Sequence, residues 1–556
     1  MLRSTPEAGH DLIAMATGVV EVLEALLADA TAKVRARVAV GGRTVTRLFN
    51  REQRAAHGLA WLATYVEAVR QLAAYAQRIH AAGNLCEVES LVVRIGLGEY
   101  LAQIFGGIPM SQGEITRPAD LGLSRADLSP RITAFVETLI ASGNTAQRRA
   151  RLVELLRAQR EAVPGISGLD DTLESIRDEM RKFAVSEVTQ QAQRWHLSNS
   201  YIPLEIVAQM AELGVFGLTI PEEFGGMGLG KQAMCVVSEE LSRGYIGVGS
   251  LGTCAEFAAE LILHSGSQEQ KRRWLPKIAD GSILPAAAIT EPASGSDLAS
   301  IRTRAVRDGN VYQIRGSKTW ITHAARADLL VLLVRTNPKE TGHRGLSILL
   351  AEKPRGNDDK PFPARGMTGS EIPALGYRGM KEFEIVCDGF EVPVSGLLGE
   401  IEGLGFKQLM RTFETARIHT AARAVGVAQS ALDQAIGYSG QRTQFGSPIA
   451  DFPRVADKLA MMATEIAIAR QLTYFAARKK DSGGRCDLEA AMSKLLAARV
   501  AWAAADNAVQ VHGGNGLALE FPVSRILCDA RVLSILEGSA EILTQVIARR
   551  LLDGSD

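Results

Sequence analysis

The sequence predicts a mainly α-helical fold with a central antiparallel β domain. Apolar residues recur every three to four positions on both sides of the chain's middle, as on one face of a helix. These repeats stand at Leu59, Leu62, Val66, Val69 and Leu72, and at Val455, Leu459, Met462, Ile466 and Ala469. Between them lie the β-prone runs "NVYQIRGSKTWIT", "DLLVLLVRT", "GLSILLAEK" and "FEIVCDGFEVP". Such runs without intervening helices indicate a small antiparallel sheet or barrel.

The order of these patterns divides the 556 residues into four predicted domains. They are an N-terminal helical extension (1–165), a helical domain (166–285), a β domain (286–398) and C-terminal helices (399–556). The extension is predicted to end at "VPGISG", residues 163–168, the clearest linker candidate. A long C-terminal helix, "LEAAMSKLLAARVAWAAADNAVQVHGG", closes at two glycines.

Composition excludes several function classes. Lys plus Arg equals Asp plus Glu at 62 each, so no net field favours nucleic acid or a membrane surface. The six cysteines show no metal-ligand spacing, so no metal site is expected. Their scattered positions indicate a protein of a reducing compartment. No uncharged apolar run of membrane-spanning length is present, so no membrane span is expected. These features predict a cytoplasmic globular protein.

One glycine motif is rejected on its context. "GVGSLG", Gly247 to Gly252, matches G-x-G-x-x-G, the dinucleotide-binding fingerprint. That fingerprint works at a turn from a strand into a helix. Here the preceding "VVSEELSRG" has a helical pattern. The motif therefore does not indicate a Rossmann domain.

Two segments of the β region suggest a site for a flat ligand. "AAITEPASGSD", residues 287–297, places Thr290 and Ser296 on a small-residue loop that is otherwise read as an ordinary polar turn. In "KTWIT", Trp320 offers an apolar plate and Thr322 a hydroxyl on the same face of a strand. Plate and hydroxyl suit a planar heteroaromatic ring. The alternative is a core tryptophan beside a satisfied threonine.

Further candidates lie in the C-terminal helices. Glu414 and Arg417 stand three apart on one helical face, where they form a salt bridge with each other or bind a polar ligand. Arg442 precedes Phe445 in a loop, where an arginine suits a diphosphate. "QVHGGNG", residues 510–516, permits close backbone approach, and its histidine is more often structural than catalytic.

Near the C-terminus, "SILEGSAEIL" encloses Glu537 among apolar residues. A carboxylate enclosed by Ile535 and Leu536 finds a partner or has a raised pKa. A raised pKa suits a proton acceptor near neutrality. Glu537 is therefore a surface residue, one half of a buried ion pair, or a general base.

Taken together, these motifs carry a resemblance. From about residue 168 to 553 the chain resembles the acyl-CoA dehydrogenase family, through "ITEPASGSD", "KTWIT", "RTQFG", "QVHGGNG" and "LEGS". The resemblance implies an α domain, a β-barrel domain and a C-terminal four-helix bundle. It also implies an FAD-dependent enzyme that removes hydrogen from the α and β carbons of an acyl-CoA thioester.

Residue roles are implied by the same resemblance. Glu537 is the base that takes the pro-R α-proton while the β-hydride passes to flavin N5. FAD is held by Ile289, Thr290, Ser296, Trp320, Thr322, Arg442, Phe445, Gln510, Gly513, Gly514, Ser539 and Glu541. The segments around Arg442 and Gln510 reach the FAD of a neighbouring subunit, so a homo-oligomer is expected. Substrate contacts are implied for Ser296, Glu414, Arg417 and Gly538.

The sequence matches the family unevenly around the base. A minority of members carry the base on an earlier helix, at the position of Ala416, which cannot accept a proton. The lack of a carboxylate at this position supports the assignment of Glu537 as the base. Leu536 replaces a common aromatic residue before the base, and we expect it to reshape the acyl end of the pocket. Pro453 replaces a glutamine common in that region, which leaves one cofactor contact in doubt.

The extension narrows the expected substrate. A helical extension before a complete core resembles the family branch that converts (2S)-methylsuccinyl-CoA to mesaconyl-CoA in the ethylmalonyl-CoA pathway. Its terminal carboxylate needs a cation or several donors, for which His323, Arg326 and Arg243 are candidates. The extension would cover a face that other members bury in a tetramer, so a dimer is favoured and a tetramer remains open.

Other functions remain open at this point. The expected electron acceptor is an electron-transferring flavoprotein. One alternative is a dehydrogenase for another short or branched acyl-CoA. A second is an acyl-CoA oxidase that uses oxygen. A third is a flavin-holding binding protein, against which Glu537 and the balanced charge argue.

Overall fold

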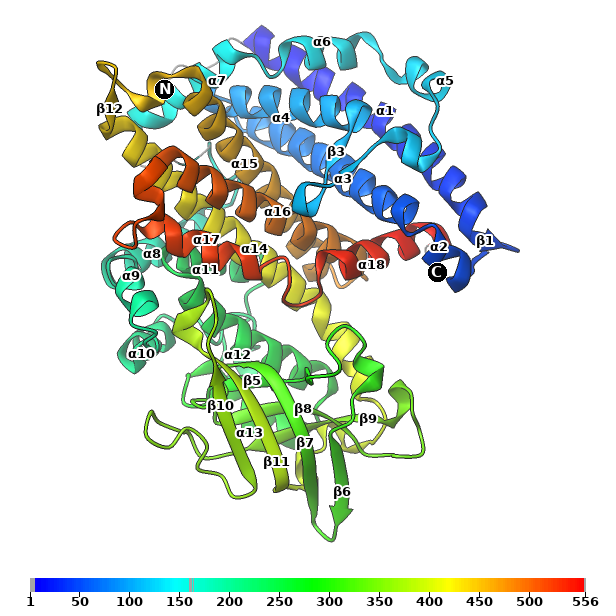
Figure 1. Ribbon diagram of the computed structural model, residues 1–556, viewed down its shortest axis with the longest axis vertical. Coiled ribbons are helices and arrows are strands. Elements are labelled where there is room, and N and C mark those ends of the chain that lie inside the picture. The colour runs from blue at the N-terminus through cyan, green and yellow to red at the C-terminus, as the bar shows by residue number, and fades with distance from the viewer. Residues whose placement is uncertain (1–5, 160–162, 164, 555–556) are drawn as a thin grey trace. The chain divides into compact units, whose positions relative to one another are not determined.

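A computed structural model describes residues 6–159, 163 and 165–554 (Figure 1). The chain forms two compact units. The first joins Met1–Glu174 to Ala424–Asp556, and the second is Ser175–Arg423. The predicted extension and C-terminal helices therefore fold together, as do the predicted helical and β domains.

The extension consists of helices joined by short hairpins. Its helices are α1 (Pro6–Val38), α2 (Thr46–Arg51), α3 (Gln53–Ala81), α4 (Glu87–Gly106), α5 (Arg125–Leu128), α6 (Ala134–Ser142) and α7 (Ala146–Ala158). Its strands are β1 (Ala39–Val40), β2 (Arg43–Thr44), β3 (Ile108–Pro109) and β4 (Ile115–Thr116). The predicted apolar repeat lies on α3, where it is buried. The helix ends before Gly83, whose φ of +71° favours glycine.

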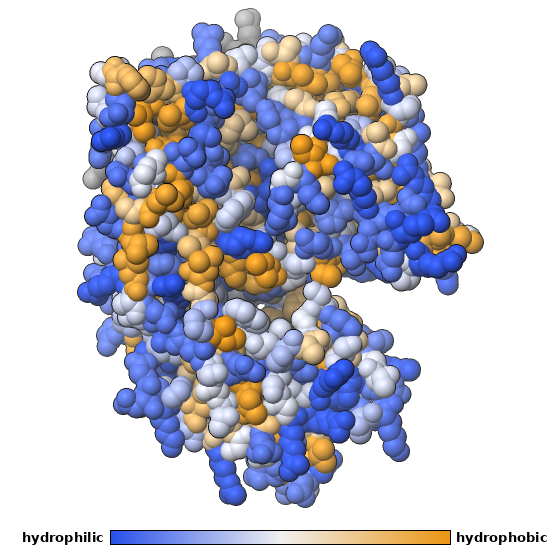
Figure 2. All heavy atoms as spheres, in the orientation of Figure 1, coloured by the Kyte–Doolittle hydropathy of each residue, from blue (hydrophilic) through white to orange (hydrophobic). Residues whose placement is uncertain are grey.

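The C-terminal part of this unit is also helical. Its elements are the end of α14 (Gly405–Gln441), β12 (Thr443–Gln444), β13 (Ser447–Pro448), α15 (Pro453–Asp481), α16 (Asp487–His512), α17 (Pro522–Val532) and α18 (Ala540–Asp553). Helix α3 packs against α15 and α18, and α4 and α7 also pack against α15. The extension and the C-terminal helices thus share one core. Figure 2 shows apolar residues reaching the surface around α17.

The predicted linker is partly tied to this core. Ile166 donates its N–H to Glu89 Oε1 at 3.0 Å and accepts a 2.7 Å hydrogen bond from the Tyr75 hydroxyl. Gln471 Nε2 donates to the Ser167 carbonyl at 2.8 Å. Residues 160–162 and 164 lie outside the described part of the chain.

The second unit begins with helices. They are α8 (Asp171–Phe183), which continues through a π-helical segment (Ala184–Thr189) into α9 (Gln190–Leu197), then α10 (Leu204–Glu212), α11 (Lys231–Gly244), α12 (Ile246–Ser265) and α13 (Gln268–Ala279). The G-x-G-x-x-G sequence lies inside α12, which agrees with its rejection as a nucleotide-binding turn. Within the described residues, α12 alone is long and apolar enough to cross a membrane, and 89% of its apolar window is buried inside the protein.

A curled seven-stranded sheet follows. Its strands are β5 (Pro285–Ala288), β6 (Arg304–Asp308), β7 (Val311–Thr322), β8 (Leu329–Arg335), β9 (Leu346–Glu352), β10 (Met367–Ile372) and β11 (Glu382–Pro393). The order is β10-β11-β7-β6-β8-β5, with β9 also paired to β8. The four predicted runs are β7, β8, β9 and β11, while the shorter β5, β6 and β10 were not predicted. Most pairs are antiparallel, but β5 and β6 pair parallel to β8.

The sheet's core explains its sequence pattern. All seven residues of β8 are buried, and β5, β6 and β9 pair with it. A strand buried on both faces loses the alternation of apolar and polar residues. The six cysteines are free thiols. No cluster of metal-ligating side chains occurs within the described ranges.

Candidate active site

The end of β7 presents an aromatic plate beside a hydroxyl. Trp320 is 55% exposed and has a φ of +56°, so it is not the core tryptophan of the alternative reading. Thr322 Oγ1 donates to Glu382 Oε1 at 2.8 Å. Glu382, the first residue of β11, is buried. An open indole face and an ordered hydroxyl at one strand end suit a flat, polar-edged ring.

A buried ion pair holds the adjacent loop against β7. Lys318 Nζ donates to the Ile289 carbonyl at 2.9 Å and to Glu291 Oε1 at 3.0 Å. Thr319 donates its N–H to the Thr290 carbonyl at 2.9 Å. Burial lowers the pKa of Lys318 to about 8, against the opposing effect of Glu291. The loop is therefore an ordered part of the sheet rather than an ordinary surface turn.

The same loop leaves one predicted hydroxyl open to solvent. Ser296 is exposed, whereas Ser294 is buried and donates to the Asp297 carbonyl. Ile289 is buried and Thr290 half-buried. The hydrogen bond from Thr319 places Thr290 beside the strand that carries Trp320 and Thr322.

Glu382 has an unusual acidity for a carboxyl group. Burial raises its pKa from 4.5 to about 7, although the hydrogen bond from Thr322 acts in the opposite direction. The group therefore changes charge near neutrality at the position next to the predicted flavin-binding hydroxyl. The sequence suggested that Glu382 lies in this region but assigned it no role.

A pH-dependent stability follows from Glu382. Between its ordinary and its folded pKa the folded protein binds more protons than the unfolded chain, so stability falls as pH rises from 4.5 through about 7. Glu382→Gln removes this titration. We compare the free energies of unfolding of the variant and the wild type. The difference in favour of the variant is expected to grow by up to about 3 kcal/mol as the pH rises from about 4 to about 8. Urea unfolding at both pH values measures the change, and a pH-independent difference between the proteins contradicts it.

Helix α14 carries the predicted polar pair and a second feature that the sequence did not reveal. Glu414 and Arg417 are both half-buried, and Ala416 between them is buried. Further along the same helix, Arg423 is 1% exposed. Its Nη2 donates to Thr420 Oγ1 at 2.8 Å. A fully buried arginine thus lies two helical turns beyond Ala416.

The contacts of Arg423 come from three separate segments. Besides Thr420, Nη1 donates to Ser250 Oγ of α12 at 2.8 Å and to the Tyr377 hydroxyl at 3.3 Å. The acceptors Thr420, Ser250 and Tyr377 are neutral hydroxyls. A hydroxyl can rotate to another partner, so the guanidinium can exchange one for a carboxylate and form a stronger charge-assisted bond. The only sequence signal was an arginine among small residues, in "HTAARAVGVA".

The three residues that the sequence suggested as partners of a substrate carboxylate are either neutral or bound to other groups of the protein. His323 is fully buried, and burial lowers its pKa to about 3, so it is neutral near pH 7. Arg326 lies 3.9 Å over the Tyr201 ring and donates to a backbone carbonyl. Arg243 lies 3.6 Å from the Glu240 carboxylate. None matches the hydroxyl-lined setting of Arg423.

In the first unit, Glu537 stands on a short loop between α17 and α18. It is half-buried, with a φ of +53°, and Gly538 follows with a φ of +98°. Such a conformation is uncommon for a residue other than glycine and often marks a functional site. Ile535 is 56% exposed, so the expectation that it encloses the carboxylate is wrong for this structure. Its side chain points to solvent because the preceding turn, closed by Ile535 N–H to the Val532 carbonyl, ends the helix there.

The residues after Glu537 begin α18. Ser539 is the N-cap, and Glu541 lies in the first turn. Burial raises the pKa of Glu541, but its own backbone N–H, the Ser539 hydroxyl and nearby His57 outweigh this effect, and its pKa is lowered. The carboxylate is therefore charged at the positive end of a helix. His57 of the extension also contacts this helix, 2.9 Å from Thr544 Oγ1.

The remaining predicted cofactor residues lie on the exposed surface of this unit. Arg442 and Gln510 are exposed, as are Gly513 and Gly514, and Phe445 is 96% exposed. The two segments meet through an aromatic cluster beneath them, since His512 stacks on Tyr438 at 4.1 Å and Tyr438 accepts a hydrogen bond from Asn515. His512 is thus structural, as the sequence suggested. These exposed groups are available to another molecule.

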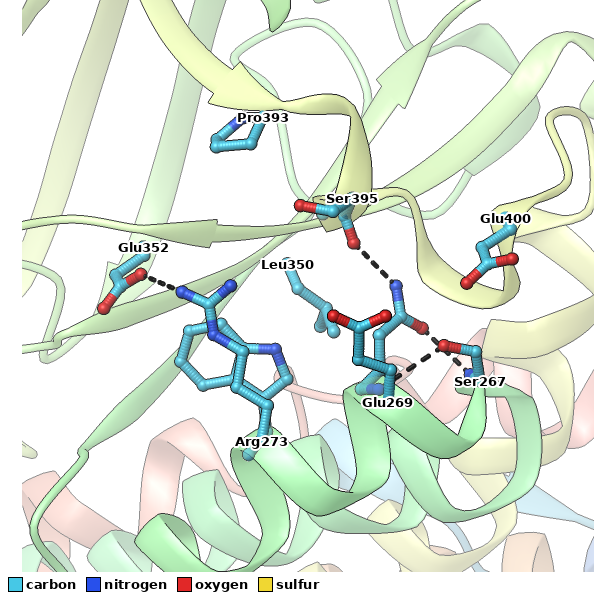
Figure 3. A pocket seen from close by; sticks show the side chains of 11 residues that line it. Ser267, Glu269, Arg273, Leu350, Glu352, Pro393, Ser395 and Glu400 are labelled. Atoms are coloured by element: carbon cyan, nitrogen blue, oxygen red, sulfur yellow. Dashed lines mark hydrogen bonds and ion pairs between the residues drawn. The ribbon is translucent and has the colours of Figure 1, made fainter. Parts of the chain in front are cut away.

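A separate shallow pocket in the second unit contains none of the predicted site residues. It is lined by Ser267, Gln270, Arg273, Glu352 and Ser395, among others (Figure 3). Arg273 pairs with Glu352 at 2.6 Å, and Gln270 donates to the Ser395 carbonyl at 2.9 Å. Its polar groups bond to one another, and we do not include it in the site.

The fold and the two groups of site residues define a class of protein. The chain matches the acyl-CoA dehydrogenase N-terminal domain over residues 170–282, the middle domain over 286–390 and the C-terminal domain over 403–552. The chain belongs to the acyl-CoA dehydrogenase family, whose members are flavin-dependent oxidoreductases. The predicted family and fold class are confirmed.

Particular relatives sharpen this assignment. The chain is 58% identical over 544 residues to the (2S)-methylsuccinyl-CoA dehydrogenase of Cereibacter sphaeroides, covering 98% of both chains. A glutaryl-CoA dehydrogenase of Mycobacterium smegmatis solved with FADH2 is 28% identical, with a TM-score of 0.62 over 68% of this chain and 94% of that one. A structure described as an electron transferring flavoprotein of Acidaminococcus fermentans is 33% identical, with a TM-score of 0.65 over 69% and 98%.

Proposed function

We propose that this enzyme oxidises (2S)-methylsuccinyl-CoA to mesaconyl-CoA with bound FAD. The relative from Cereibacter sphaeroides supports the choice through its 58% identity over nearly the whole chain, including the extension. The structural observation that carries the choice is Arg423, a buried cation that donates hydrogen bonds to rotatable hydroxyls. A dicarboxylic acyl group needs such a cation, and a neutral acyl group does not.

The residues of this chain fit a flavin. The exposed indole of Trp320, the Thr322 hydroxyl and the ordered loop with Ile289, Thr290 and Ser296 are suited to a planar ring with polar edges. Ser539 and Glu541 are assigned to the adenosine side. When bound, FAD supplies the acceptor for the hydride that leaves the β carbon.

Glu537 is the proposed base. Its carboxylate takes the α-proton of the thioester, and its backbone N–H polarises the thioester oxygen so that the α carbon becomes acidic enough. We assign Glu414, Arg417, Ser296 and Gly538 to the CoA ester. Ala416, the alternative base position of the family, presents only a methyl group.

Arg423 is the proposed partner of the substrate's terminal carboxylate. Ala416, Thr420 and Arg423 share one face of α14, since they are separated by four and three residues. Two turns, roughly 10 Å along the axis, separate Ala416 from Arg423. An extended arginine reaches back over part of that length because helical side chains lean toward the N-terminus. Tyr377 and Ser250 keep the guanidinium oriented between turnovers.

The proposed electron acceptor is an electron-transferring flavoprotein, as the family resemblance implies. The alternative acceptor is oxygen. Turnover with an added flavoprotein acceptor and without peroxide supports the dehydrogenase, whereas peroxide formed at the rate of substrate loss identifies an oxidase.

We propose a homodimer. Helices α3, α4 and α7 of the extension pack on α15, and α3 also packs on α18, so these helix faces are already covered within one chain. The exposed Arg442, Phe445 and Gln510 are the residues assigned to a neighbouring subunit's FAD. Light scattering of the full-length holoenzyme is expected to give twice the chain mass of 59.7 kDa. A monomer or a tetramer contradicts this proposal.

A substrate panel tests the proposed function. We expect the value of kcat/KM for (2S)-methylsuccinyl-CoA to exceed those for butyryl-CoA and 2-methylbutyryl-CoA by about 10²-fold or more, because only the first pairs with the buried cation. A preference for either neutral thioester contradicts the proposed substrate while leaving the family unaffected.

A further inference from the structure

A buried lysine reaches the loop that carries Glu537. Lys494 lies on α16 and is 1% exposed. Its Nζ donates to the Gly538 carbonyl at 2.7 Å. Neither the family motifs nor the assigned roles involve this residue.

The loop needs support at this peptide. Glu537 and Gly538 both have positive φ values, and a glutamate held in that region is unfavourable unless its surroundings fix it. The backbone forms a turn before Glu537, through Ile535 N–H to the Val532 carbonyl, and a hydrogen bond from Ala540 N–H to the Ser534 carbonyl spans the loop. The bond from Lys494 ties the intervening turn to a different helix.

The chemistry of a buried ammonium makes this tie strong. An ammonium in a helix core is costly unless it is hydrogen-bonded, so its donors stay directed at fixed acceptors. A charged donor also forms a shorter and stronger bond than a neutral one. The Gly538 carbonyl, one residue beyond Glu537, is therefore held in one direction, because breaking this hydrogen bond would cost the buried ammonium one of its acceptors.

We propose that Lys494 is a positioning residue for the reaction: it fixes the Glu537–Gly538 turn and so aims both the Glu537 carboxylate and its backbone N–H. The proposal rests on Glu537 being the base. Lys494 does not itself contact the substrate. It determines how often the free loop holds the geometry that proton removal requires, and a misplacement of about 1 Å at such a site costs about 10²-fold in rate.

Lys494→Met tests the proposal, because methionine fills most of the lysine volume but donates no hydrogen bond. The readouts are FAD content, the dissociation constant for substrate, and the rate of flavin reduction at saturating substrate under anaerobic conditions. We expect the first two to stay within about twofold of the wild type and the rate to fall by roughly 10-fold to 10²-fold. Lys494→Gln, which keeps a donor, is expected to retain more of the rate than Lys494→Met.

Lys458→Met is the matched control. Lys458 lies on α15 in the same unit and donates to Asn507 Oδ1 at 3.2 Å, so its replacement removes a lysine hydrogen bond that does not reach the loop. It is expected to keep the wild-type rate. If Lys494→Met does not fold, Lys494→Gln is compared with the control by the same readouts. A lower rate of flavin reduction in Lys494→Gln at unchanged FAD content and substrate affinity supports the positioning role, and an equal rate contradicts it.

The outcomes separate this inference from the proposed function. A wild-type rate in Lys494→Met, or a loss of rate matched by an equal loss of FAD or substrate affinity, overturns the positioning role. A wild-type enzyme whose flavin is not reduced by (2S)-methylsuccinyl-CoA overturns the proposed function instead.

Discussion

We expect the Glu537→Gln variant to bind its flavin normally but to lose flavin reduction by substrate. Glutamine keeps the shape of the side chain and the backbone N–H, but it cannot accept the α-proton. A positioned general base contributes about 10² to 10⁴ in rate, and the family's alternative base position is Ala416 here, which cannot accept a proton. Anaerobic stopped-flow measurement of the flavin absorbance gives the rate directly.

The control for this variant is Glu520→Gln. Glu520 is an exposed carboxylate just before α17, so its replacement changes the charge equally without touching the loop. The control is expected to reduce its flavin at the wild-type rate. Normal reduction by Glu537→Gln together with failure of Glu414→Gln would move the base to α14 and contradict the assignment.

Arg423→Met is expected to reverse the enzyme's substrate preference. Without the guanidinium, the substrate's terminal carboxylate enters a buried site unpaired, which costs about 2 to 5 kcal/mol. The value of kcat/KM for (2S)-methylsuccinyl-CoA should fall by about 10²-fold or more. A neutral acyl-CoA of similar size loses no such interaction, so butyryl-CoA is expected to retain its rate or gain. Steady-state kinetics with both substrates measures the reversal.

Arg326→Met is the matched control for this experiment. Arg326 is a half-buried arginine of the same unit that stacks on Tyr201, and the sequence made it a candidate for the same role. Its replacement is expected to affect both substrates equally. Selective loss of methylsuccinyl-CoA oxidation in Arg326→Met, with Arg423→Met unaffected, contradicts the proposed carboxylate site.

Sequence reasoning proposed site residues only within contiguous motifs. Trp320 and Thr322 are two residues apart on one strand, so regular alternation predicted a common face, although the structure has a register shift and a φ of +56° at Trp320. Arg423 escaped notice because its partners Ser250 and Tyr377 come from segments far away in the chain. Lys494 escaped for the same reason, since Gly538 belongs to another element of the fold.

In the fold, too, local patterns predicted single elements but not how those elements pack. The apolar repeat of α3 predicted the helix, but periodicity does not reveal which partner a face meets. The extension therefore looked like a separate domain, whereas α3 packs on α15 and α18 in one core. The alternation of β7 and β11 predicted strands, while β5 was too short and β6 and β10 were too short and too polar to be recognised. The exposure of Ile535 depends on where α17 ends, which apolar character alone does not determine.

One measurement tests the central claim most directly. The purified enzyme with bound flavin is mixed with one equivalent of (2S)-methylsuccinyl-CoA without oxygen, and the flavin spectrum and the acyl-CoA product are recorded together. The proposed function predicts that the oxidised-flavin absorbance bleaches and that mesaconyl-CoA forms in proportion to the reduced flavin. An unchanged flavin spectrum with (2S)-methylsuccinyl-CoA, together with bleaching by butyryl-CoA, would contradict it.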